Sequence, residues 1–120
     1  MRFEAGRLFT SLKGAIPDLK ATVVFDRAGE FEIHLAPGFE FDADTFATEY
    51  TTLFRIAQRT AEDTELGNVS EQILITEKAI LLARRFAGDG IAVFLCGTNQ
   101  QLGRLRFEVR HLIRKTEESA

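Results

Sequence analysis

The sequence offers one thiol that could act as a nucleophile. Cys96 is the only cysteine among 120 residues, so the chain cannot form a disulfide within itself. It ends an apolar segment just ahead of a predicted helix, and a helix N-terminus stabilises a thiolate. A free cysteine in such a place is more often a small buried hydrophobe. We therefore expect an inert Cys96, and an enzyme built on this thiol is the least favoured alternative.

Paired polar residues suggest two further kinds of chemistry. His34 and Glu32 share one face of a predicted strand, where they would form half of a metal site or simply lie in solvent. Asp42 and Asp44 resemble the paired carboxylates of acid–base catalysis, but they stand where a helix begins, and helix capping explains them. His111 lies among charges on a polar helix face. We expect no catalytic residue and no metal ion.

Glycine-rich nucleotide-binding motifs are absent from the sequence. Neither GxxxxGK[ST] nor GxGxxG occurs, and the zinc motif HExxH is also missing. The segment Gly88-Asp89-Gly90 connects two predicted strands, so a hairpin turn explains it. We expect no cofactor and no enzymatic activity.

An aromatic residue among arginines suggests a phosphate or nucleic-acid patch. Phe107 falls off the apolar arc of the last predicted helix, beside Arg110 and Arg114. The alternative is that Phe107 packs on the first helix while the arginines face water and pair with Glu117 and Glu118. The net charge is −3, which favours this alternative, and we expect no nucleic-acid partner.

The charge is unevenly distributed along the chain. Residues 40–71 hold two arginines against eight acidic residues, a net charge of −6. Residues 78–116 hold eight basic residues against two acidic ones, a net charge of +6. Such a separation can steer docking even when the total is small.

The localisation follows from two features. A lone cysteine favours a reducing compartment, so we expect a cytoplasmic protein. No apolar run approaches the length of about 18 residues that spans a bilayer, and we expect no membrane insertion.

Hydrophobic periodicity predicts a helix, two strands, a helix, three strands and a helix. The expected helices cover 3–14, 42–64 and a segment from a cap at Thr98 or Asn99 to Thr116, and the expected strands cover 21–25, 31–35, 69–77, 79–86 and 91–96.

The long helix has a distinct apolar arc. Phe46, Tyr50, Leu53 and Phe54 lie on this arc, with a cap at Asp42 or Asp44 before them and the helix exit Leu66-Gly67 after them. Ile56 is displaced from the arc, and Arg55 and Arg59 point toward solvent.

The strand 91–96 is apolar at both parities, which places it at the centre of a sheet covered on both faces. Two hairpins indicate mainly antiparallel pairing. The expected fold is an α/β three-layer sandwich of profilin-like type, with a central five-stranded sheet, one long helix on one face and two helices on the other. Residues 1–120 form one domain.

The strand 69–77 suggests self-association. Ile73, Leu74 and Ile75 make it β-prone, and if it lies at the sheet edge, no proline or lysine blunts its pairing stretch. Such an edge invites a second copy, and together with Ile56 it predicts a two-fold homodimer. The alternative is a monomer with a tolerated edge.

Several local motifs, in this order and spacing, resemble the roadblock family, also called dynein light-chain roadblock-type domains, and among them the MglB-like bacterial members. The resemblance covers almost the whole chain. The segments that carry it are Ile16-Pro17-Asp18-Leu19, residues 21–26 with Gly29, Leu66-Gly67, Asn99, Leu102-Gly103 and Arg106.

The resemblance implies a homodimer with a shared sheet and with the two long helices side by side. The expected dimer interface comprises Glu49, Thr52, Ile56, Glu71, Ile73, Leu74 and Ile75. Such modules bind small Ras-like GTPases as regulators, including GTPase-activating proteins that donate no arginine finger, or serve as scaffolds in signalling. Carried over, the partner-binding residues are Thr48, Thr52, Arg55 and Arg59. A purely structural dimer and a small-ligand sensor stay open as alternatives.

Overall fold

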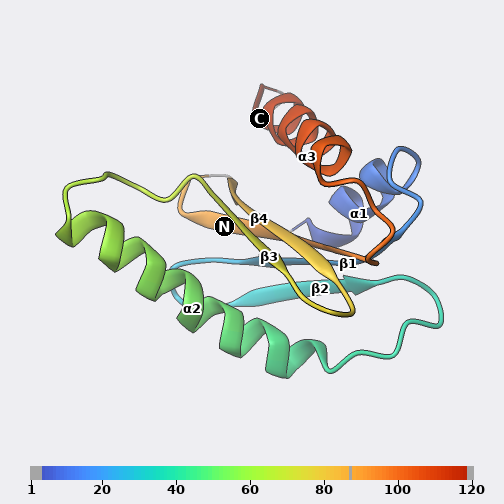
Figure 1. Cartoon of the computed structure of the whole chain (residues 1–120), viewed down its shortest axis with the longest axis horizontal. Coiled ribbons are helices and arrows are strands. Elements are labelled where there is room, and N and C mark those ends of the chain that lie inside the picture. Colours follow the sequence, from blue (N-terminus) through green and yellow to red (C-terminus); the bar gives the residue numbers. More distant parts are fainter. Residues whose placement is uncertain (1–3, 87, 119–120) are drawn as a thin grey trace.

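The computed structural model describes residues 4–86 and 88–118. The elements follow the predicted order (Figure 1). They are α1 (Ala5–Lys13), β1 (Leu19–Phe25), β2 (Phe31–Leu35), α2 (Ala43–Asp63), β3 (Glu71–Ile75), β4 (Ile80–Phe86), β5 (Gly90–Cys96) and α3 (Leu102–Glu118).

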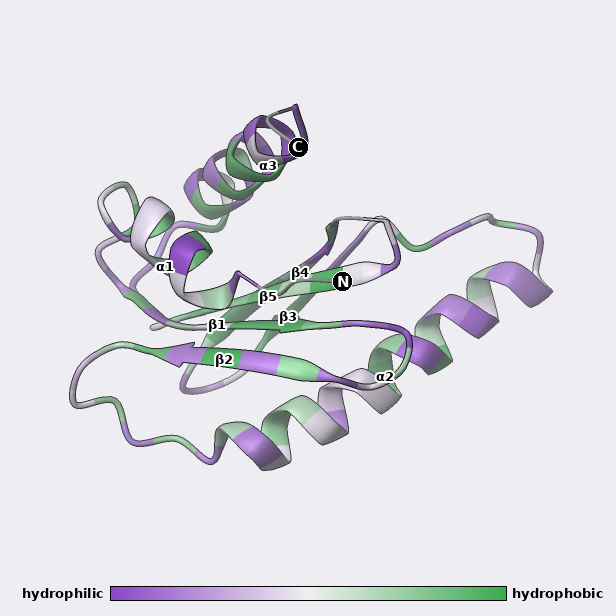
Figure 2. Cartoon of the chain, turned by 180° about the vertical axis from the view of Figure 1, so that it is seen from behind, coloured by the Kyte–Doolittle hydropathy of each residue, from purple (hydrophilic) through white to green (hydrophobic). Residues whose placement is uncertain are grey.

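The five strands form one antiparallel sheet in the order β2-β1-β5-β4-β3. The apolar strand β5 is therefore central, as its composition predicts, and β3 lies at an edge. The long helix α2 covers one face, and α1 and α3 lie on the other, as both views show (Figures 1 and 2). The predicted α/β three-layer sandwich is confirmed.

Each face of the sheet has its own core because strand residues alternate between faces. On the side of α1 and α3, Phe94 and Leu82 pack with Leu105. On the side of α2, Val93 and Leu81 pack with Phe54. The sheet is thus buried on both sides, and α2 is held mainly by the residues of its first half.

The strand β3 and the start of α3 differ from the sequence prediction for reasons that the local hydrogen bonds show. The strand β3 is shorter than 69–77, because the Thr76 hydroxyl accepts the amides of Lys78 and Ala79 and starts the turn there. The prediction that Thr98 or Asn99 caps α3 is wrong, since residues 97–100 form a turn and the helix begins at Leu102.

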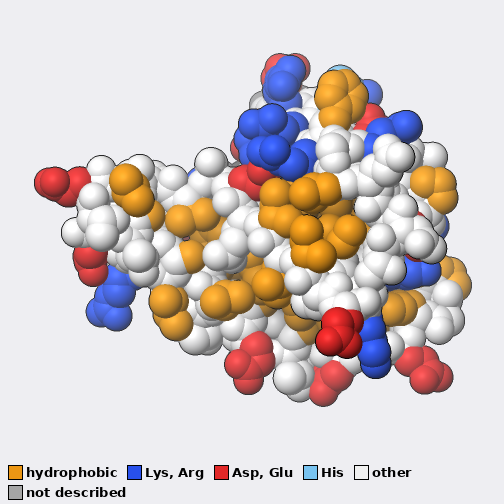
Figure 3. Space-filling view, viewed as in Figure 1, with side chains coloured by type: hydrophobic (Ala, Val, Ile, Leu, Met, Phe, Trp, Pro, Cys, Tyr) orange, Lys and Arg blue, Asp and Glu red, His pale blue; other side chains and the backbone are white. Residues whose placement is uncertain are grey.

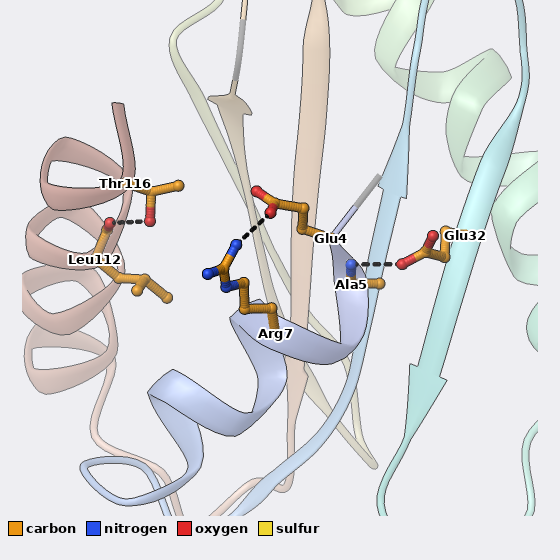
Figure 4. Close-up of polar contacts among 6 residues, drawn as sticks. All are labelled: Glu4, Ala5, Arg7, Glu32, Leu112 and Thr116. Atoms are coloured by element: carbon orange, nitrogen blue, oxygen red, sulfur yellow. Dashed lines mark hydrogen bonds and ion pairs between the residues drawn. The ribbon is translucent and has the colours of Figure 1, made fainter. Parts of the chain in front are cut away.

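A side-chain carboxylate accepts a backbone amide in the first turn of each of the other two helices. Glu32 of β2 accepts the Ala5 amide at 2.7 Å at the start of α1, and Arg7 pairs with Glu4 beside it (Figure 4). Asp42 caps α2 as predicted, accepting the Thr45 amide at 3.1 Å and its hydroxyl at 2.7 Å. These bonds from Thr45 lower the pKa of the Asp42 carboxyl.

Within the described ranges 4–86 and 88–118, no helix combines the length and the apolar character that crossing a membrane requires.

Candidate protein-interaction surface

The candidate nucleophile lies in the core. Cys96 is fully buried at the end of β5, and the turn 97–100 separates it from α3. Burial, and then the charge of Asp18, raise the pKa of the thiol to about 12. Such a shift favours the protonated thiol near neutral pH. The expectation of a buried cysteine is confirmed.

The candidate metal residues His34 and Glu32 are engaged in structural contacts. The His34 ring packs at a tilt against the Phe9 ring with 4.7 Å between ring centroids, while the Glu32 carboxylate accepts the Ala5 amide at the start of α1. Over the part of the chain that the structure describes, no three His, Cys, Asp or Glu side chains are grouped closely enough to hold a metal ion.

The edge strand β3 exposes apolar side chains on both faces of the sheet. Leu74 is opposite Leu81 and so shares the face of α2, and it is 39% exposed. Ile75 is opposite Ile80 on the face of α1 and α3, and it is 62% exposed. Apolar side chains are gathered over β3 and its neighbours in Figure 3. The edge therefore combines unpaired backbone with uncovered apolar surface.

Glu71 begins this strand but is already paired within the chain. Its carboxylate receives Arg84 at 2.9 Å and Arg106 of α3 at 2.7 Å, and its side chain is 11% exposed. The backbone of Glu71 remains on the edge, whereas its charge is used to join β3, β4 and α3.

One line of α2 carries the other residues of the expected dimer interface. Glu49, Thr52 and Ile56 are all exposed and follow one another at helical spacing. Ile56 is 57% exposed, as its displacement from the arc predicts. Leu53, a residue of the apolar arc, is 42% exposed beside this line. Apolar surface thus continues along α2 on the face that Leu74 shares.

The partner-binding candidates occupy an adjacent line of α2. Thr48, Thr52, Arg55 and Arg59 are exposed. Arg55 donates to the carbonyl oxygen of Arg27 at 2.9 Å and thereby ties α2 to the β1–β2 turn. The four exposed side chains thus follow one another at helical spacing along α2.

A network of hydrogen bonds centred on Gln58, which sequence analysis missed, holds the loop after α2. The Gln58 side-chain oxygen accepts the Val69 amide at 2.9 Å and the Arg85 guanidinium at 2.6 Å, and its nitrogen donates to Asn68 at 2.8 Å. Arg85 also donates to the Val69 carbonyl at 3.0 Å. Gln58 also donates to Glu62, four residues on, but the three partners that hold the loop lie 10, 11 and 27 residues away, where no local sequence signal marks them.

Phe107 does not pack on α1. The prediction that it does is wrong, because the side chain is 66% exposed and stacks on His111 with 6.3 Å between ring centroids. Arg110 and Arg114 are exposed nearby, as predicted. In the described ranges 4–86 and 88–118, no ion pair joins either arginine to Glu117 or Glu118.

The exposed side chains described on α2 and on the edge of β3 are mainly apolar residues, arginines and threonines. Such a surface suits contact with another protein.

Comparison with known proteins identifies the fold. No protein-family model matches the sequence, and no curated protein matches it. Solved structures do match. A roadblock/LC7 domain from Streptomyces avermitilis is similar over 98% of both chains, with a TM-score of 0.79 at 16% identity.

Two MglB structures are also similar. Myxococcus xanthus MglB matches with a TM-score of 0.75 at 15% identity, over 95% of this chain and 91% of that one. The gliding protein MglB from Thermus thermophilus matches with a TM-score of 0.76 at 15% identity, over 100% of this chain and 96% of that one. The predicted resemblance is confirmed at the level of the fold, and the chain has the roadblock/LC7 fold.

Proposed function

We propose that the chain is a homodimeric, non-enzymatic regulator or scaffold that binds a small Ras-like GTPase through α2. The observation that carries this proposal is a row of exposed side chains along α2. The helix covers one face of a sheet whose edge strand β3 has no partner strand on its outer side. The fold supports it, because MglB, a gliding protein, has the same architecture.

In the proposed dimer, β3 of one copy pairs with β3 of another and the two α2 helices lie side by side. Antiparallel pairing across a two-fold axis joins the sheets and keeps α2 of both copies on one face. The proposed interface consists of Glu49, Thr52, Ile56, Glu71, Ile73, Leu74 and Ile75. It would cover the exposed apolar surface of Ile56, Leu74 and Ile75.

Light scattering across a concentration series tests the dimer. Leu74→Lys and Ile56→Lys are expected to shift it toward the monomer, because each places a charge in an apolar contact. Thr10→Lys, at an exposed position of α1, is the matched control and should leave the mass unchanged. A wild-type monomer at micromolar concentration contradicts the proposal.

The proposed GTPase-binding residues are Thr48, Thr52, Arg55 and Arg59. A panel of purified small Ras-like GTPases from the same organism, loaded with a non-hydrolysable GTP analogue, supplies the probes. Arg59→Glu and Arg55→Glu should each abolish capture. Arg104→Glu, which reverses an exposed charge on α3, is the control. Undiminished capture by both α2 variants would remove this surface from the proposal.

Regulation and scaffolding differ in their effect on nucleotide turnover. A regulator changes the rate at which the captured GTPase hydrolyses GTP, whereas a purely structural dimer or scaffold leaves it unchanged. A single-turnover hydrolysis assay separates the two. In neither case does the chain itself hydrolyse nucleotide.

A small-ligand sensor is the second candidate, favoured by a hollow of about 520 Å³ beneath the second half of α2. Phe25, Phe54 and Arg59 contribute to its lining. A thermal-shift screen with metabolites tests this function, and an Arg59→Ala variant should lose any shift that arises there.

We also propose that residues 1–120 form a single roadblock-type domain that works in the cytoplasm, without nucleic acid and without insertion into a membrane. Fractionation of cells that express the tagged chain tests its compartment.

A further inference from the structure

A basic groove lies between α3 and β4, next to Ser70, the residue that precedes β3. It has a volume of about 900 Å³. Five arginines contribute to its lining against one glutamate, Glu117; they are Arg84, Arg85, Arg106, Arg110 and Arg114. Lysine and arginine side chains gather beside α3 in Figure 3. The groove therefore favours an anionic occupant.

The outer wall of this groove, formed by Phe107, Arg110 and Arg114 of α3, presents uncompensated positive charge and an exposed aromatic ring. The floor is partly neutralised, because Arg84 and Arg106 share the carboxylate of Glu71. Among the residues that the structure describes, no carboxylate forms an ion pair with Arg110 or Arg114. Phe107, 66% exposed, lies beside them. The occupant that suits this wall carries carboxylates next to an apolar side chain.

The chain itself carries such a segment. Residues 62–66, here called the acidic tip, end α2 and contain Glu62, Asp63 and Glu65 followed by Leu66. Leu66 is 79% exposed, the highest value among the exposed large hydrophobic residues that the structure describes. Hydrogen bonds from the Glu65 amide to the Glu62 carbonyl at 3.1 Å and from the Leu66 amide to the Ala61 carbonyl at 2.8 Å hold the tip in shape. The tip is therefore preformed, which lowers the entropic cost of docking.

The tip is also placed to reach another molecule. Figure 1 shows the end of α2 extending beyond the sheet, away from α3. A chain thus keeps its own tip apart from its own groove. Between two copies the same surfaces are free to meet.

We propose that the acidic tip of one copy docks into the basic groove of a second copy, with Leu66 against Phe107 and the carboxylates of Asp63 and Glu65 near Arg110 and Arg114. The contact joins two different surfaces, so it is heterologous and links copies head to tail. It is independent of the proposed function and of pairing through β3, because neither the tip nor the outer wall of α3 belongs to that edge.

Sedimentation velocity at low and high salt tests the contact. At about 20 mM salt the wild type should form species larger than its basal state, and at about 300 mM salt these should disappear, because screening weakens exposed charge pairs. The tip variant Asp63→Lys/Glu65→Lys and the groove variant Arg110→Glu/Arg114→Glu should each weaken this association by at least about fivefold. An equimolar mixture of the two variants should associate again, because each now offers the complement of the other.

Matched controls reverse charges outside the two surfaces. Glu30→Lys lies in the β1–β2 turn and Arg104→Glu lies on α3 away from the groove, and both should associate as the wild type does. Leu66→Ser and Phe107→Ser remove the apolar part without a change of charge and should also weaken association. Circular dichroism confirms that each variant is folded.

Three results would overturn the proposal. The first is a wild type whose mass does not change between low and high salt. The second is a mixture of tip and groove variants that fails to associate although each variant is folded. The third is a groove that retains phosphatidylserine vesicles through Arg110 and Arg114 while the chain does not self-associate, which assigns the groove to an anionic lipid surface. Repeating the measurement with Leu74→Lys separates this contact from dimerisation through β3.

Discussion

Replacement of Glu71 by glutamine should destabilise the folded chain, although the residue lies on an edge strand. The carboxylate is 11% exposed and receives two guanidinium groups, from Arg84 at 2.9 Å and from Arg106 at 2.7 Å. Glutamine keeps the size of the side chain but removes its charge and turns one acceptor into a donor. One of the two arginines then faces an N–H group.

The magnitude follows from the exposure of each partner. The Arg84 side chain is 23% exposed, so the loss of its charge-assisted bond is worth about 1.5 kcal/mol. The Arg106 side chain is 43% exposed and is screened by water, so its loss adds about 0.5 kcal/mol. The expected total is about 2 kcal/mol, or a fall in Tm of about 8 °C for a chain of this size.

Urea unfolding followed by circular dichroism measures this change. Wild type and variant are compared at one protein concentration, because self-association adds to apparent stability. Glu30→Gln, an exposed turn residue, is the control and should change the free energy of unfolding by less than about 0.5 kcal/mol. A double-mutant cycle with Arg84→Gln isolates the pair. The reasoning is refuted if Glu71→Gln matches the control or if the coupling with Arg84 is close to zero.

Three further changes are expected to affect stability. Burial raises the pKa of the Cys96 thiol from 9.0 to about 12, so the thiol of the unfolded chain ionises at lower pH than that of the folded chain. The free energy of unfolding should therefore fall by up to about 1.4 kcal/mol per pH unit between these two values. Urea titrations at pH 8–10.5 should show this slope, and Cys96→Ala should reduce it. Phe54→Ala should cost about 3 kcal/mol by the same assay, because the ring is 4% exposed and packs edge-on against Phe25; a loss below about 1 kcal/mol would contradict this packing. Asp42→Ala should lower the urea midpoint at pH 7, and because the pKa of Asp42 is lowered, the difference from wild type should shrink as the pH falls through the acid range; a constant difference argues against the cap.

The fold was predictable from the sequence because its strongest signals are local. The strand β5 is apolar on both faces over its whole length, and only the centre of a covered sheet accommodates that pattern. The cap at Asp42 depends on a residue three positions away. Both patterns involve residues within a few positions of one another, so the sequence alone reveals them, and the structure agrees with them.

The parts that could not be predicted depend on residues far apart in the chain. The charge of Glu71 is taken up by Arg106, which lies 35 residues away. Phe107 is apolar, and periodicity alone does not reveal that its side chain is 66% exposed. Gln58 has an unremarkable sequence context, and only the return of the chain at Val69 and Arg85 gives it a role.

The hydrogen bonds of Gln58 couple the position of α2 to the segment that leads into β3. One side-chain oxygen holds the Val69 amide and the Arg85 guanidinium, so α2 cannot rotate about its axis without moving both or losing both bonds. A partner that displaces α2 should therefore also displace the residues just before the edge strand β3. The hydrogen-exchange rate of the Val69 amide in the isolated chain reports whether this displacement occurs.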